Sequence, residues 1–113
     1  MIFTFGNFEV DEELFELRTN GAAIPVAPRA FDTLSFLIRN RHRVVSKSEL
    51  VAGPWRGAAV SDGALRQAIM QLRRALGDEP TSRRIIETVR GRGFRFREGV
   101  TERPSEDVLD RCG

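Results

Sequence analysis

The chain has 113 residues, with 18 Lys+Arg against 16 Asp+Glu and a hydrophobic content of 41%, which is typical of one globular domain and excludes a chain disordered throughout. One Cys and one His cannot form an internal disulfide or a Cys/His zinc site, and no apolar run reaches the roughly 18 residues of a membrane-spanning helix. We therefore predict no metal, no cofactor, no membrane segment within the chain, and a cytoplasmic location.

The charges are distributed unevenly along the chain. Residues 1–28 hold one Arg and five acids, residues 29–97 hold 15 basic and six acidic residues, and residues 98–113 hold two Arg and five acids. The net charge of +2 therefore combines blocks of −4, +9 and −3. The basic middle block is the part of the chain suited to approach phosphate.

Residues 2–26 are predicted to form an antiparallel sheet of four short strands, because apolar residues alternate there with polar or small ones. The residues expected to point inward are Phe3, Phe5, Phe8, Val10, Phe15 and Leu17. Asn20-Gly21 is a strong hairpin signal, so residues 14–18 should pair with residues 22–26. The acids expected on the solvent face, where they would repel a polyanion, are Glu9, Asp11, Glu12, Glu13 and Glu16.

Two helices follow, where the apolar spacing changes from 2 to 3.6 residues. Pro28 suits the first turn of a helix that runs to about residue 41. Ser46 and Glu49 form the capping-box pattern at the start of a second, short helix, which a Gly-Pro pair ends. Trp55 is expected to fill the core beside this helix.

A third helix is predicted over residues 61–77, with Gly77 as its left-handed end. Its buried stripe comprises Leu65, Ile69, Leu72 and Leu76. The opposite face carries no carboxylate, whereas an ordinary solvent-exposed helix mixes both signs of charge. That face comprises Gly63, Gln67, Met70 and Arg74, with Arg66 and Gln71 at its flanks and Arg73 on the shoulder.

Residues 85–97 are predicted to form a β-hairpin, because two alternating segments flank a turn whose two glycines permit positive φ. Arg90 and Arg92 lie at the tip of this hairpin. Residues 98–113 are polar, acidic and without apolar period, which is typical of a flexible tail or linker. We therefore predict one domain over residues 1–97 and an acidic tail over residues 98–113.

Little in the chain supports catalysis. His42 lies in an arginine-rich stretch, and no Ser or Asp pattern accompanies it as a general base. The glycines of the hairpin turn lie between two strands rather than before a helix, so they lack the context of a nucleotide-binding loop. We predict neither an enzyme nor a small-molecule substrate.

The third helix and the hairpin point to double-stranded DNA. A helix about 10 to 12 Å across fits the major groove. There Gln67 and Gln71 can pair with adenine edges, and Met70 can contact a thymine methyl, while Arg66 or Arg74 can bind guanine. The arginines at the hairpin tip suit the minor groove or its flanking phosphates. The alternative is that these arginines form an ordinary solvated surface in a chain with a strong arginine preference.

Four stretches carry a resemblance to a known family. They are residues 28–34 (PRAFDTL), 43–50 (RVVSKSEL), 72–78 (LRRALGD) and 86–96 (IETVRGRGFRF). In this order and spacing, residues 2–97 resemble the OmpR/PhoB-type winged helix-turn-helix domain. The resemblance implies an α+β fold with an N-terminal four-stranded antiparallel sheet, three helices and a C-terminal hairpin. The third helix would be the recognition helix, and residues 85–97 would be the wing.

The resemblance also implies partners and DNA-binding positions. Such domains bind DNA as head-to-tail pairs, so a second copy in tandem is expected. In activators of this type the loop before the recognition helix meets RNA polymerase, and that loop here contains Trp55, Arg56 and Gly57. The predicted DNA-binding residues are Arg66, Gln67, Met70, Gln71, Arg73, Arg74, Thr88, Arg90 and Arg92.

The chain departs from the family pattern at several points. Met70 and Gln71 occupy positions that are commonly basic, and Pro54 shortens the second helix. No receiver domain precedes Met1, so phosphorylation of a receiver aspartate is not expected within this chain, and a longer regulator could continue beyond the acidic tail. The leading hypothesis is a sequence-specific transcriptional regulator, or the DNA-binding domain of a larger one. The alternative is a winged-helix module that contacts a protein partner and has lost DNA binding.

Overall fold

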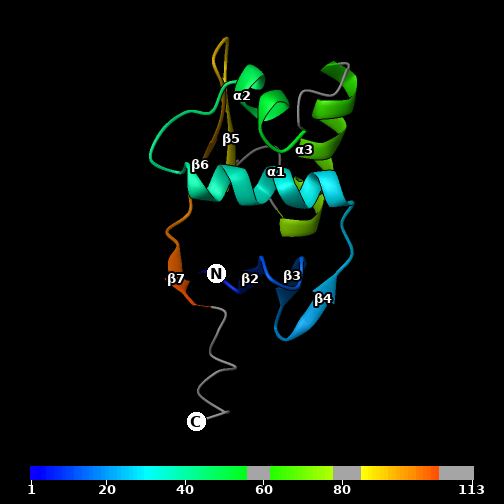
Figure 1. Ribbon diagram of the computed structural model, residues 1–113, viewed down its shortest axis with the longest axis vertical. Coiled ribbons are helices and arrows are strands. Elements are labelled where there is room, and N and C mark those ends of the chain that lie inside the picture. The colour runs from blue at the N-terminus through cyan, green and yellow to red at the C-terminus, as the bar shows by residue number, and fades with distance from the viewer. Residues whose placement is uncertain (56–61, 78–84, 105–113) are drawn as a thin grey trace. The chain divides into compact units, whose positions relative to one another are not determined.

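The computed structural model describes residues 1–55, 62–77 and 85–104, and the chain divides into two compact units (Figure 1). One unit comprises Met1–Pro25 together with the residues from Gly99 on, and the other comprises Val26–Glu98. The first is a sheet, and the second combines helices with a hairpin. The predicted α+β fold class is confirmed.

The N-terminal unit is an antiparallel sheet with the described strands in the order β4-β3-β2-β1-β7. They are β1 (Ile2–Phe5), β2 (Phe8–Asp11), β3 (Glu16–Thr19), β4 (Ala22–Ile24) and β7 (Thr101–Arg103). Alternation buries Phe3, Phe5 and Leu17 as predicted. The predicted hairpin at Asn20 and Gly21 is confirmed, because both residues have positive φ, of 51° and 83°, as a type I′ turn requires.

The described sheet has one strand more than the predicted four. Residues 101–103 pair with β1, with Ile2 opposite Arg103, and Arg103 Nη2 lies 3.1 Å from Glu9 Oε2. The predicted domain boundary at residue 97 and flexible tail from residue 98 are therefore wrong for this segment. All three residues of β7 are exposed, so no apolar alternation marks the strand in the sequence. The rest of the predicted tail, residues 105–113, lies outside the described residues.

Two predictions for side chains in this unit are wrong. Phe15, expected to point inward, is 70% exposed and has a φ of +53°. Asp11, expected on the solvent face, is buried and accepts hydrogen bonds from the backbone N–H groups of Glu13 and Leu14. An aspartate that closes a turn in this way interrupts the strand alternation that the sequence pattern implied.

Arg18 lies among the acids of this sheet. Its guanidinium is 2.8 Å from Glu16, 3.3 Å from Glu9 and 3.4 Å from Asp11. Burial works against the charged form, but the hydrogen bonds to Glu16 and Glu9 prevail and raise the pKa of Arg18. Three of the five acids predicted to face solvent therefore have an internal cation beside them.

The second unit contains, within the described residues, three helices and a two-stranded hairpin. They are α1 (Pro28–Arg39), α2 (Lys47–Ala52), α3 (Asp62–Leu76), β5 (Ile86–Val89) and β6 (Gly93–Phe96). Helix α1 ends two residues earlier than predicted. It packs against α3 and β6, and the core between them includes Leu34, Leu37 and Phe96. Gly77, with a φ of +67°, follows α3 as predicted.

The link between α1 and α2 is tied to the hairpin. Val45 and Phe94 exchange two backbone hydrogen bonds of 2.7 and 2.8 Å. Gly93 lies at a φ of +145°, and a Cβ atom there would collide with the carbonyl oxygen of Val45, so only glycine fits. The predicted capping box of α2 is confirmed by the hydrogen bonds between Ser46 and Glu49, of 3.0 and 3.1 Å. The start of α2 is thereby held beside the hairpin.

Candidate nucleic-acid interface

Helix α3 separates a buried stripe from an exposed ridge. The four leucine and isoleucine residues of the predicted stripe are buried. On the opposite side Gln67, Met70 and Arg74 are exposed, and Met70 exposes 49% of its surface. These three residues are called the exposed ridge. The prediction of which face of the helix is exposed is confirmed. That face follows from helical spacing alone.

A groove of about 360 Å³ follows one side of the ridge, between α3, the start of α2 and β5. We call it the wing-side groove. Its lining comprises Lys47, Leu65, Arg66, Ile69, Met70, Arg73, Thr88 and Phe94. Lys47 and Arg66, both exposed, bring positive charge from two different helices. The groove is therefore cationic at its opening and apolar at its base.

Arg73, which was predicted to bind DNA, is buried. Only 9% of its surface is exposed. One guanidinium nitrogen, Nη2, donates to the carbonyl oxygen of Ile86 at 3.0 Å and to Oγ1 of Thr88 at 2.8 Å. The helical wheel placed Arg73 on the shoulder of α3, but the hairpin covers that shoulder. Arg73 therefore ties the recognition helix to β5.

The hairpin carries two further cations on a narrow tip (Figure 1). Arg90, Gly91 and Arg92 form the turn and are exposed, and Gly91 has the positive φ, +75°, that the glycine prediction required. Thr88 also lies on the exposed side of β5, although its Oγ1 accepts a hydrogen bond from the buried Arg73.

Lys47 is a candidate that the sequence analysis missed. It lines the wing-side groove and also a second groove of about 450 Å³ between the start of α2 and the hairpin turn. It therefore joins Arg66 on α3 to Arg90 and Arg92 on the hairpin. The sequence does carry one indication of this role: Lys47 directly follows the Ser46 cap, and a residue there projects from the first turn of the helix.

In the part of the chain that the structure describes, the cations of this surface lack the carboxylate partners that other cations have. Arg43 pairs with Glu49, at 2.6 Å, and Arg97 pairs with Glu87, at 3.7 Å. Within the described ranges, no ion pair involves Lys47, Arg66, Arg74, Arg90 or Arg92. Positive side chains gathered without internal partners are the electrostatic footprint of a nucleic-acid surface.

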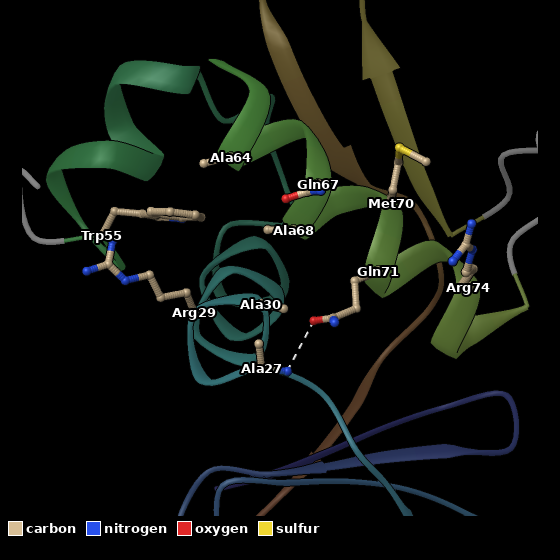
Figure 2. Close-up of a pocket in the computed structure, with 10 residues that line it drawn as sticks. All are labelled: Ala27, Arg29, Ala30, Trp55, Ala64, Gln67, Ala68, Met70, Gln71 and Arg74. Carbon is tan, nitrogen blue, oxygen red and sulfur yellow. Dashed lines mark hydrogen bonds between the residues drawn. The ribbon is translucent and has the colours of Figure 1, made fainter. Parts of the chain in front are cut away.

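A groove of about 580 Å³ follows the other side of the ridge, between α1 and α3 (Figure 2). We call it the α1-side groove. Gln71 spans it, because its Oε1 accepts a hydrogen bond of 3.1 Å from the backbone N–H of Ala27, just before α1. Gln71 was predicted to pair with adenine, which requires a free acceptor and a free donor on the amide. Its acceptor is engaged within the protein.

Trp55 is a core residue rather than an exposed partner contact. It is 6% exposed, and its indole N–H donates to Oγ1 of Thr33 at 3.0 Å. The guanidinium of Arg29 lies over the ring, 5.0 Å from the centroid. The expectation that Trp55 fills the core is confirmed. The other two predicted loop residues, Arg56 and Gly57, lie outside the described residues.

Two other kinds of site are absent from the part of the chain that the structure describes. No group of three or more His, Cys, Asp or Glu side chains lies close enough to hold a metal ion. None of the described helices is long and apolar enough to cross a membrane.

The comparison with known proteins agrees with this geometry. Residues 21–96 match the family described as transcriptional regulatory protein, C terminal. The chain is 27% identical over 108 residues to the transcriptional activator CadC of Escherichia coli, which covers 92% of this chain and 21% of CadC. It is 34% identical over 91 residues to the transcriptional regulatory protein KdpE of Mycobacterium tuberculosis, which covers 80% of this chain and 40% of KdpE.

Solved structures give the same answer for the fold. The DNA-binding domain of E. coli CadC superposes with a TM-score of 0.78 at 26% identity, covering 90% of this chain and 96% of that one. The Klebsiella pneumoniae RstA DNA-binding domain, solved in complex with the RstA box, gives a TM-score of 0.72 at 25% identity, covering 85% and 96%.

The chain spans well under half the length of the curated relatives named above, but it covers nearly the whole of the DNA-binding domains of CadC and RstA that were solved alone. The family match, which extends over most of the chain, includes the helices and the hairpin. The chain therefore belongs to the family of transcriptional regulatory protein C-terminal domains, which are OmpR/PhoB-type winged helix-turn-helix domains.

Proposed function

We propose that this chain binds double-stranded DNA sequence-specifically, as a transcriptional regulator or as the DNA-binding domain of a larger one. The observation that carries the proposal is the set of cations that runs from α3 through Lys47 to the hairpin tip and has no carboxylate partner among the described residues. The RstA domain, which has the same fold, was solved on its DNA box. The chemistry of the surface and the fold of the relatives support the same ligand.

The exposed ridge is the part that reads bases. Gln67 is exposed and free to present both its amide donor and its acceptor to adenine. Arg66 or Arg74 can bind the two acceptors of guanine, and Met70 can contact a thymine methyl group. Gln71 contributes less than predicted, because the backbone of Ala27 engages its acceptor oxygen.

The hairpin and α2 hold the DNA in position. Lys47 at the start of α2 and Thr88 on the wing strand β5 line the same grooves, where they can contact backbone phosphates. Arg90 and Arg92 at the narrow tip suit the minor groove or the phosphates beside it. Such contacts fix the register of the protein on the duplex without reading its sequence.

Further partners follow from the family and are part of the proposal. A second copy would bind in tandem on a repeated half-site, and RNA polymerase would meet the loop that contains Arg56 and Gly57. Binding to chromosomal DNA implies a nucleoid-associated, cytoplasmic location.

The test compares a selected duplex with a random duplex of the same length. A duplex recovered from a randomised pool serves as the specific site, and fluorescence anisotropy across a salt series gives both affinities. Arg66→Ala or Gln67→Ala should weaken the selected duplex by about 1 to 3 kcal/mol and relax base preference. Equal losses on selected and random duplexes for both variants would contradict base reading by the ridge. Absence of any duplex binding at low salt would favour the protein-interaction alternative.

A further inference from the structure

The α1-side groove is not explained by base reading or by the wing. Its described lining comprises Ala27, Arg29, Ala30, Trp55, Ala64, Gln67, Ala68, Met70, Gln71 and Arg74. Two of these residues are arginines and none is acidic. Three of them, Gln67, Met70 and Arg74, are also the exposed ridge, so the groove is continuous with the surface proposed to enter the major groove.

The two arginines lie at opposite ends of the groove. In Figure 2, Arg29 lies beside Trp55 at the α1 end, and Arg74 lies on the far side of Gln71, near the C-terminal end of α3. Their guanidinium groups do not converge on one point. A small anion held by both is therefore disfavoured, whereas a chain of spaced negative charges can meet them in succession.

The small side chains of the groove leave room for such a chain. Ala30, Ala64 and Ala68 form much of the wall between the two arginines (Figure 2). Alanine offers no group that would exclude a sugar-phosphate backbone or compete with the arginines for phosphate. The volume of about 580 Å³ is larger than that of either groove on the wing side.

Arg29 is held in place by neutral contacts that leave its charge available. Its guanidinium lies over the ring of Trp55, which is itself fixed by the hydrogen bond to Thr33. This cation–π contact brings no carboxylate to the guanidinium, so its N–H donors can still bind an oxygen ligand. No ion pair of Arg29 occurs among the described residues.

Gln71 sets the position of Arg29 relative to α3. The hydrogen bond from the Ala27 backbone to Gln71 joins the chain just before α1 to the recognition helix. Arg29 follows two residues later, in the first turn of α1. The start of α1, which carries Arg29, is thus held beside α3 by a contact that involves no charged group.

The width of the major groove, about 12 Å, is close to the diameter of a helix with its side chains. Both DNA backbones must therefore pass close to the two flanks of α3. The wing-side groove, with Lys47 and Arg66, faces one of them. We propose that the α1-side groove holds the other, with Arg29 and Arg74 on two separate phosphates of the strand opposite to the one held beside the wing. This inference rests on the proposed function and adds a second phosphate-binding flank to it.

The test uses the whole chain and the duplex recovered by selection, about 20 base pairs long. Arg29→Gln removes the stacked charge from an exposed position, and Arg97→Gln is the matched control, because Arg97 pairs with Glu87 and lines none of the three grooves. Arg29→Gln should weaken selected and random duplexes alike, roughly five- to tenfold at about 0.1 M salt, and reduce the salt slope by about 0.9. Arg97→Gln should change neither by more than about twofold.

The strand is identified with single neutral methylphosphonates placed along each strand of the selected duplex. At one position, the neutral methylphosphonate should weaken duplex binding by the unchanged protein but should not weaken binding by the Arg29→Gln variant any further. The same comparison with the Lys47→Gln variant should identify a second phosphate. The phosphate identified with Arg29→Gln should lie on the opposite strand to that one. Gln71→Glu is a second variant, since it keeps the acceptor for Ala27 but adds a negative charge to the groove, and it should weaken all duplexes at least as much as Arg29→Gln.

Three results would overturn the inference in distinguishable ways. If Arg29→Gln and Gln71→Glu bind as tightly as the unchanged protein while Arg92→Gln does not, the second flank is wrong and the proposed function stands. If Arg29→Gln keeps duplex binding but abolishes binding of a polyglutamate peptide, the groove belongs to an acidic protein partner instead of DNA. If the unchanged protein binds no duplex at low salt, the proposed function itself fails.

Discussion

The arginines of the two units are used in opposite ways. In the N-terminal sheet, Arg18 contacts three carboxylates and Arg103 contacts Glu9. On α3 and the hairpin tip of the second unit, no ion pair with any described residue involves Arg66, Arg74, Arg90 or Arg92. The same side chain stabilises a fold where carboxylates surround it and remains available to a polyanion where they are missing.

Composition cannot make this distinction. The chain as a whole has a net charge of +2, which predicts little affinity for DNA. The placement of the carboxylates decides which cations are free. Affinity for DNA is therefore better predicted from the ion pairing of each cationic side chain than from the net charge of the chain. Four experiments test how far that contrast extends.

The largest effect is expected at the paired arginine of the sheet. Arg18→Met should destabilise the protein by about 2 to 3 kcal/mol, because the side chain of Asp11, 7% exposed, would lose its cation. Urea denaturation followed by far-UV circular dichroism measures the loss. Duplex affinity of the folded protein should be unchanged. A stability loss below about 0.5 kcal/mol would place Arg18 with the ordinary surface arginines.

Arg73 is intermediate, since it is buried but bonded to neutral oxygens. Arg73→Met should cost about 1 to 2 kcal/mol in stability, because the Ile86 carbonyl and the Thr88 hydroxyl lose a charged donor. The salt slope of duplex binding should not change. Arg73→Lys keeps the charge without the planar fork and is the matched comparison. If Arg73→Met instead lowers the salt slope of duplex binding by about 0.9 and leaves the unfolding stability unchanged, Arg73 contacts a phosphate.

At the hairpin tip the effect should appear in binding alone. Arg92→Ala should weaken every duplex by about 1 kcal/mol and lower the salt slope by about 0.9, while unfolding stays within about 0.5 kcal/mol of the unchanged protein. Anisotropy titrations over a salt series provide the measurement, with Arg103→Ala as the control from the other unit. A loss confined to the selected duplex would mean that Arg92 reads bases instead of phosphates.

The smallest effect concerns Glu49, the acid paired with Arg43 at the start of α2. The hydrogen bond from Arg43, followed by that from the Ser46 backbone, lowers the pKa of Glu49 from 4.5 to about 2. Because the folded-state pKa lies below the unfolded one, the stabilisation is complete above about pH 4.5 and is lost as the pH falls toward 2. The urea midpoint should decline over that window, and Glu49→Gln should flatten the decline. A profile identical in both proteins would show that the pair is too exposed to matter.

Local patterns predicted most of the fold. The turn at Asn20 and Gly21, the capping box at Ser46 and the buried stripe of α3 each depend on residues within a few positions of one another, and each is confirmed. The exposed ridge follows from the same helical geometry. These features are encoded by nearest neighbours, so no tertiary information was needed to find them.

The errors at Asp11 and Phe15 come from a local turn, whereas the differences at the candidate interface involve partners far apart in the sequence. Arg73 is covered by β5, Gln71 is engaged by Ala27, which is 44 residues away, and Lys47 meets the hairpin only through the bridge between Val45 and Phe94. A helical wheel records direction around one axis and cannot show which neighbour covers that direction. Strand β7 was missed for the same reason, since its pairing with β1 leaves no apolar alternation in its own residues.

The pairing of β7 with β1 also affects the order of folding. Its partners, such as Ile2 and Arg103, are separated by nearly the whole described chain, and the complete second unit lies between them in sequence. Contacts of such long sequence separation form late, because the intervening loop must first be closed. During synthesis strands β1 to β4 can pair with one another as local hairpins, but the pairing of β1 with β7 must wait until the helices and the hairpin have been made. The described sheet therefore reaches its full width only after the second unit has been synthesised.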